Sequence, residues 1–154
     1  MVVDAAITIG RAEDLSAEEL EIIQIAAWFH DTGFRDVYEG HEDRSEEIAL
    51  QFLKSENAPK ALIEGVLNCI QATKRQVEPT GILTKVMLDA DMYHLASASY
   101  KEHSGRLQRE WETIYKKEYP ELEWSKLNLD FVSKHKFHTN YGNEILRPKS
   151  DQLI

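Results

Sequence analysis

The sequence predicts an all-helical fold organised as a single domain over residues 1–154. Apolar residues recur at helical rather than alternating spacing, glycine and proline fall between the apolar segments, and strand patterns are nearly absent. With 154 residues, 42% of them hydrophobic and 29% charged, the chain is large enough to bury a core. We therefore expect one compact bundle of helices.

Charge and cysteine content exclude several classes of protein. The net charge of −9 argues against a nucleic-acid-binding surface, which needs clustered basic residues. The single cysteine, Cys69, leaves no internal disulfide and suits a reducing compartment. No apolar run approaches the length of a membrane span, and the N-terminus lacks the pattern of a signal peptide. We expect a cytoplasmic protein that has neither nucleic acid nor membrane as a partner.

The first half of the chain contains four predicted elements. Residues 2–9 fit either a strand or one face of a helix, and we interpret them as the end of a helix whose first turns are missing. Ser16–Glu19 reads as a capping box, which predicts a helix ending at His30. His41 opens a helix whose acidic first turn complements the helix dipole. Pro59 suits the first position of the next helix.

Four further helices are expected after the polar turn at residues 74–81. They span Ile82–Met92, residues 101–119, Trp124–Phe137 and about Asn140–Leu153. The second of them should bury a stripe of side chains made of Leu107, Trp111, Ile114 and Tyr115. Pro120 should end that helix, and Pro148 should kink or break the last one.

A histidine and a carboxylate stand side by side where an apolar segment ends, at His30 and Asp31. Imidazole and carboxylate are common protein ligands for divalent cations. Neighbouring side chains on a helix point about 100° apart, so this pair can bind one ion only where the helix ends. Gly33 is expected to end it. The alternative is an ordinary helix end with a packed histidine and a solvated carboxylate.

Two carboxylates, Asp89 and Asp91, interrupt a later apolar helix. A buried carboxylate normally finds a cation, hydrogen bonds or a proton, because burying it unpaired is costly. A functional role is therefore about as well supported as solvation of Asp89 and capping or arginine pairing of Asp91. Two weaker signals are His41–Glu42, which also reads as a plain helix start, and Lys74–Arg75, which also reads as a plain helix end.

Taken in order, these motifs resemble the HD superfamily of metal-dependent phosphohydrolases, and in particular a bacterial branch of HD hydrolases. The likeness runs over nearly the whole chain. It rests on Phe29–Phe34, Tyr38, His41–Glu42, Ser45, Ala72–Thr73–Lys74, Asp89–Ala90–Asp91 and the series Trp124, Phe131, His135 and Thr139.

This resemblance implies an HD-like orthogonal helical bundle in which His30, Asp31 and Asp91 hold a divalent cation. Mn, Fe, Ni, Co or Mg would suit the mixed nitrogen and oxygen ligands. The family's first metal histidine normally precedes an apolar segment that corresponds here to Val2–Val3, so it would fall just upstream of Met1. His41 or His94 could stand in for it.

The same resemblance implies hydrolysis of a small phosphorylated substrate, such as a nucleotide or a related metabolite. Asp31, Asp89 and Glu42 are the predicted catalytic residues, and Lys74, Arg44 and Arg75 are the predicted phosphate contacts. The alternative is a catalytically degenerate HD-fold module that binds a ligand or partner. A homodimer is left open, because missing N-terminal turns would expose part of the core.

Overall fold

The computed structural model describes residues 1–74 and 77–153, which form helices and no strand. The α-helices are α1 (Val2–Ala12), α2 (Ala17–Phe29), α3 (His41–Ser55), α4 (Lys60–Ala72), α5 (Ile82–Asp91), α6 (Tyr100–Tyr115), α7 (Glu121–Lys134) and α8 (Arg147–Asp151). Two short 3₁₀ helices, η1 (Thr32–Arg35) and η2 (Met92–Ala96), and a π-helix, η3 (Gly142–Leu146), connect them. The predicted all-α class is confirmed.

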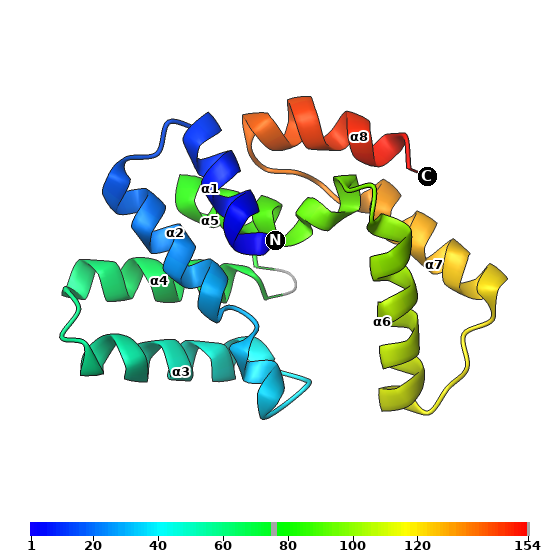
Figure 1. Cartoon of the computed structure of the whole chain (residues 1–154), viewed down its shortest axis with the longest axis horizontal. Coiled ribbons are helices and arrows are strands. Elements are labelled where there is room, and N and C mark those ends of the chain that lie inside the picture. The colour runs from blue at the N-terminus through cyan, green and yellow to red at the C-terminus, as the bar shows by residue number, and fades with distance from the viewer. Residues whose placement is uncertain (75–76, 154) are drawn as a thin grey trace.

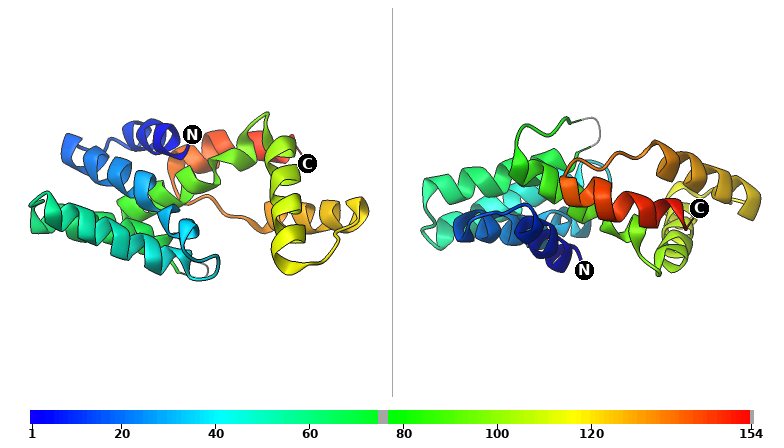
Figure 2. Two further views of the ribbon diagram at one scale, coloured as in Figure 1. Left: turned by 60° about the horizontal axis from the view of Figure 1, so that its bottom comes forward. Right: turned by 90° about the horizontal axis from the view of Figure 1, so that it is seen from above.

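The helices α1 to α5 form a packed body, and α6 and α7 stand at one end of it (Figure 1). Within the body α5 packs against α1, α2 and α4, while α3 lies beside α4. Both views of Figure 2 keep the α6–α7 pair at that end. The largest fully buried side chains in the body are Ile9, Ile23, Val66, Ile70, Val86 and Met87. No helix in the described ranges is both long and apolar enough to cross a bilayer.

Two of the local signals that start helices act as predicted, whereas Pro59 lies just before α4 and not at its first position. The Ser16 hydroxyl accepts a hydrogen bond from the Glu19 amide at 3.3 Å, and the Glu19 carboxylate accepts one from the Ser16 amide at 2.9 Å. This capping box satisfies two amides that the first turn of α2 leaves unpaired. Residues 2–9 are helical rather than extended, and α3 begins at His41 as expected.

Gly33 differs from its prediction. The helix α2 ends at Phe29, and Gly33 lies buried inside η1 with a negative φ, so it is not a helix-ending glycine. A Cβ atom there would stand 2.0 Å from the His41 carbonyl oxygen and 2.8 Å from the Ser45 amide. The glycine is needed because the start of α3 packs directly on this backbone, and its own amide donates to the Ser45 hydroxyl at 2.8 Å.

The second half of the chain departs from prediction in α6. This helix ends at Tyr115, well before Pro120, because Lys116 takes up the left-handed conformation with φ of 50°. None of its residues is buried, and Leu107, Ile114 and Tyr115 of the expected inner stripe are exposed. These side chains are exposed because α6 lies outside the body and has little to pack against (Figure 1).

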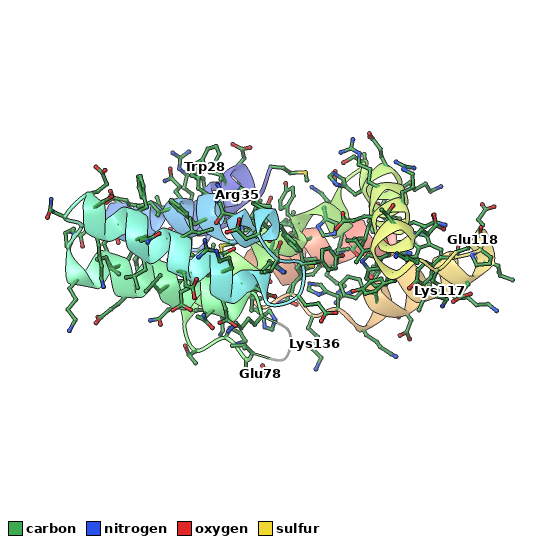
Figure 3. All side chains as sticks on the ribbon, turned by 90° about the horizontal axis from the view of Figure 1, so that it is seen from below. Trp28, Arg35, Glu78, Lys117, Glu118 and Lys136 are labelled. Carbon is green, nitrogen blue, oxygen red and sulfur yellow. The ribbon has the colours of Figure 1, made fainter. Side chains whose placement is uncertain are left out.

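The apolar pattern of the helix expected to end at His30 predicts that Trp28 buries a share of its side chain. Trp28 is instead 71% exposed and points away from the body (Figure 3). The helix expected over about Asn140–Leu153 is divided next to Pro148, which lies in the first turn of α8, where a missing amide hydrogen leaves no bond unmade. The irregularity falls just before it, in the π-helix η3.

Candidate metal centre

His30 stands at the C-terminal end of α2 and is almost fully buried. Its amide donates to the Ala26 carbonyl at 2.9 Å, and its Nδ1 lies 2.8 Å from the Ala27 carbonyl oxygen. A carbonyl can only accept, so Nδ1 carries a proton and donates it. This bond fixes the ring and turns Nε2 away from the helix, as outer hydrogen bonds do for ligating histidines.

Two carboxylates approach that Nε2 atom. Asp31 Oδ2 lies 3.2 Å away and Asp91 Oδ1 lies 3.5 Å away. The chain has left α-helical geometry at Asp31, with φ of −106° and ψ of 3°, so adjacent side chains can turn to the same side. Asp91 arrives as the last residue of α5. The structure thus brings together the histidine and the two carboxylates that the motif predicted.

His41 extends this cluster from the start of α3. Its Nε2 lies 3.6 Å from Asp31 Oδ1, and its Nδ1 is 3.1 Å from the Tyr38 carbonyl oxygen. The ring also stacks on Phe34, with centroids 3.5 Å apart. Glu42 follows, with an oxygen 3.5 Å from His41 Nδ1. Both residues lie at the edge of the cluster.

The electrostatics of the cluster favour a positive charge between the carboxylates. Burial alone disfavours a charged imidazole, but the contacts with Asp31 and then Asp91 outweigh burial and raise the pKa of His30 to about 10. Its Nε2 is also buried without a hydrogen bond of good geometry among the described residues. A buried polar atom in that situation normally has a partner.

The donors fit a divalent cation by type and by pairwise spacing. Ligands about 2.0–2.2 Å from one ion lie about 3.0–3.5 Å from one another at tetrahedral or octahedral angles. The separations of His30 Nε2 from the oxygens of Asp31 and Asp91, 3.2 and 3.5 Å, agree with this spacing. Over residues 1–74 and 77–153, however, no three His, Cys, Asp or Glu side chains form a complete metal-binding group.

Asp89 plays a different part from the one predicted. It is completely buried, and its Oδ1 accepts from the His138 amide at 2.9 Å. Its Oδ2 accepts from the Thr139 amide at 2.9 Å and from the Thr139 hydroxyl at 2.6 Å. A Cβ atom on Gly142 would stand 2.2 Å from the same oxygen. Asp89 therefore holds the C-terminal segment in place through these hydrogen bonds. The prediction that Asp89 is a catalytic residue does not agree with this position.

The predicted phosphate contacts are already paired with carboxylates. Arg44 Nε lies 2.6 Å from Asp36 Oδ2, and its Nη1 is 2.8 Å from Glu47 Oε2. Lys74 pairs with Asp43 on the first turn of α3. A phosphate would have to compete with these acids. Arg75, the third predicted contact, lies outside the described residues.

A pocket that was not predicted from the sequence opens beside the cluster. It has a volume of about 350 Å³, and its lining includes both Asp31 and Asp91. Its other side is formed by residues of α6 and α7. A signal was present in α6, where His103, Arg106, Leu107 and Glu110 are spaced to share one helix face. Of these four residues only Leu107 was assigned a place, in the expected buried stripe, and the other three were given no role.

No family model, curated protein or solved structure matches this chain. The HD resemblance and the orthogonal arrangement of the bundle therefore stay predictions from the motifs.

Proposed function

We propose that this chain is a metal-dependent phosphohydrolase of the HD type that acts on a small phosphorylated metabolite, with nucleotides among the candidates. The single observation that supports the proposal most is the approach of Asp31 and Asp91 to the same ring nitrogen of His30. His30 and Asp31 follow α2 whereas Asp91 ends α5, and a chance grouping would not explain why the buried imidazole of His30 turns its unbonded nitrogen toward two acids.

In this proposal His30, Asp31 and Asp91 hold the cation, and the Nδ1 hydrogen bond to Ala27 keeps the imidazole oriented. When bound, a divalent cation polarises a phosphoryl oxygen and lowers the pKa of a water molecule. His41, beside Asp31, and Glu42, beside His41, would orient a water molecule at this site. Because the chain is strongly acidic, the bound cation also offsets repulsion of the phosphate.

The test combines metal binding with turnover. Purified chain is titrated with Mn²⁺ in a calorimeter and assayed with p-nitrophenyl phosphate and bis(p-nitrophenyl) phosphate in the presence of Mn²⁺ or Mg²⁺. We expect metal-dependent cleavage of at least one ester, and loss of both binding and cleavage in Asp91→Ala. Asp130→Ala, an exposed acid on α7, is the matched control and should behave as the original chain.

A version extended upstream to supply the expected histidine is assayed in parallel. If neither version binds metal or cleaves either ester, the hydrolase proposal is wrong.

A second candidate is a non-catalytic module that keeps the fold and binds a ligand or partner. The observation that favours it is the lack of a complete metal-binding group in the described part of the chain. In such a module Asp91→Ala would leave metal uptake unchanged and could raise the free energy of unfolding, because it removes a partly buried carboxylate.

A further inference from the structure

One wall of the pocket beside the metal-centre candidate belongs to α6. His103, Arg106, Leu107 and Glu110 all line the pocket, and their spacing of three or four residues puts them on one face of the helix. The pocket has a volume of about 350 Å³, near the lower end of the usual range of about 300–1,000 Å³ for ligand sites. It therefore suits one small ligand, and the side chains of α6 determine which chemical groups that ligand can carry.

Hydrogen bonds to α7 fix the base of α6. The Tyr100 hydroxyl donates to Asn128 Oδ1 at 3.0 Å, and the Ser104 hydroxyl donates to the same oxygen at 2.8 Å. Trp124 Nε1 donates in turn to the Ser104 hydroxyl oxygen at 2.9 Å. This network holds the backbone on either side of Ser104, from which the charged residues of the pocket wall project.

Arg106 has hydrogen-bond donors to spare. Its Nη2 atom pairs with the carboxylate of Glu102, one turn earlier on the same helix. The two side chains are 59% and 64% exposed, so solvent screens this pair and weakens it. A guanidinium carries five N–H donors in a planar fork that matches two oxygens of a phosphate. Arg106 is therefore better placed to bind phosphate than Arg44, which has two acid partners and does not line this pocket.

His103 provides a second donor in the first turn of α6. Its half-buried ring lies 5.9 Å from that of His94, measured between centroids, and makes no hydrogen bond among the described residues. An imidazole carries at least one N–H in either charge state, so His103 can donate. His94 adds no donor, because its Nδ1 already donates to the Asp91 carbonyl at 3.1 Å and the neutral ring then has only an acceptor at Nε2.

Carboxylates around the pocket limit where an anion can lie. Asp31 and Asp91 line it from the side of the body, and Glu110 stands one turn beyond Arg106 on the same face of α6. Each of these three groups repels an anion. The favourable position is therefore against α6, between His103 and Arg106, and the nearby acids keep the affinity modest.

We infer that His103 and Arg106 bind the phosphate group of a small phosphorylated molecule, with the rest of that molecule in the pocket. No metal ion takes part in this contact, so it is available whether the chain is a hydrolase or a non-catalytic module. The two residues take over the role predicted for Lys74 and Arg44, which are paired with acids elsewhere. A phosphate fits better than a carboxylate, because it brings more oxygens and a charge close to −2 to donors on neighbouring turns.

A metal-free titration tests this site. The isotope-labelled chain is titrated with phenyl phosphate at constant ionic strength in the presence of EDTA, and NMR shifts of its amides report both binding and folding. We expect saturable shifts centred on His103 and Arg106. Arg106→Gln should weaken binding by about tenfold or more, because a charged, two-pronged contact is lost. Arg109→Gln, an exposed arginine of α6 outside the pocket lining, is the matched control and should bind as the original chain does.

Glu110→Gln should have the opposite effect. Removing the repelling charge beside Arg106 should strengthen binding of phenyl phosphate about two- to fivefold, which a merely damaged helix would not do. Glu118→Gln, an exposed acid beyond the end of α6, is the control for the change in net charge. Acetate is the comparison probe for a carboxylate ligand, and we expect it to bind more weakly than phenyl phosphate.

Three results would overturn this assignment: no saturable shift, equal affinities for acetate and phenyl phosphate, or equal effects of Arg106→Gln and Arg109→Gln. Binding that needs Mn²⁺ and is unaffected by Arg106→Gln also overturns it, while leaving the hydrolase proposal standing. Metal-free binding that depends on Arg106, without metal-dependent cleavage of either nitrophenyl ester, supports the phosphate site and contradicts the hydrolase proposal.

Discussion

The imidazole of His30 and the carboxylate of Asp91 meet at 3.5 Å, from the C-terminal ends of two different helices. Both helix ends carry partial negative charge from unpaired carbonyl groups. Together with the two carboxylates, they make this junction a place where a cation is stabilised. Substitutions at this site should therefore act mainly by changing the charge that a bound cation meets.

Replacing Asp91 by asparagine should weaken Mn²⁺ binding by about tenfold or more, since a charged ligand becomes a neutral one. The side chain keeps its size, so the body should fold unchanged. Calorimetric titration gives the affinity, and circular dichroism checks the fold. Asp130→Asn is the control. Equal affinities of Asp91→Asn and the original chain would remove Asp91 from the ligand set.

Asp89→Asn should destabilise the fold rather than act on the site. The asparagine amide nitrogen would face backbone donors of the segment at His138 and Thr139, leaving hydrogen bonds unmade in the interior. Hydrogen bonds to a charged group contribute about 1.5–3 kcal/mol each, so we expect a loss of at least about 2 kcal/mol in the free energy of unfolding. Urea unfolding followed by circular dichroism measures it. A variant with unchanged stability but lost metal affinity would return Asp89 to the site.

Gly33→Ala should be costly where Gly81→Ala is not. The added methyl group at Gly33 collides with the backbone of His41 and Ser45, whereas at Gly81 nothing lies within 4 Å of the corresponding position. Overpacking of this kind costs about 1–3 kcal/mol. Because the collision pushes α3 away from η1, His41 should also lose its place beside Asp31. Urea midpoints for the two variants provide the comparison, and equal midpoints would contradict the close approach.

Stability should fall as the pH drops from 7 to 5, in part through His135. Burial, and then the charge of Arg147, lowers the pKa of His135 from 6.5 to about 4. The unfolded chain therefore takes up a proton below pH 6.5 that the folded chain refuses until about pH 4, which favours unfolding as the pH falls between these values. The expected loss from this residue is on the order of 1 kcal/mol.

The measurement compares the free energy of unfolding at pH 7 and pH 5 for the original chain and for His135→Phe. The difference between the two pH values should be smaller in the variant. His30, whose pKa is raised to about 10, contributes more stability as the pH falls toward 6.5, but this contribution is the same in both chains and cancels in the comparison. A variant that loses as much stability as the original chain would show that His135 is not responsible.

The sequence predicted the parts of the fold that depend on short-range chemistry. Ser16 and Glu19 form the expected capping box, and α3 begins at His41, because each signal acts within one helical turn. Gly33 was predicted to end the preceding helix, but the structure needs a glycine there because α3 packs directly on its backbone. The close packing of α3 on η1 is a long-range contact that no local pattern encodes.

The two carboxylates of α5 show what separates site residues from structural ones. Asp89 and Asp91 are two positions apart, so they point to roughly opposite sides of the helix. The motif could place both in the site, yet only one side of α5 faces His30. The other side meets the segment at Thr139, and that contact depends on where the chain's last helices pack.

The exposure of α6 could not be predicted because its periodicity is that of an ordinary amphipathic helix. What differs is the amount of protein available to cover it. Leu107 and Tyr115 remain exposed, and the side-chain contacts between α6 and the segment that follows it include the ring contacts of Trp111 with Tyr119 and Trp124.

Because of those ring contacts, the intrinsic tryptophan fluorescence of the chain reports on the contact between α6 and α7. Of its three tryptophans, Trp111 and Trp124 lie in an aromatic cluster that joins α6 to α7, whereas Trp28, in the last turn of α2, is exposed to solvent. A quencher dissolved in the buffer reaches Trp28 first, which leaves an emission signal dominated by the two clustered indoles. Any molecule that draws α6 and α7 toward the body can then be followed by fluorescence without attaching a dye.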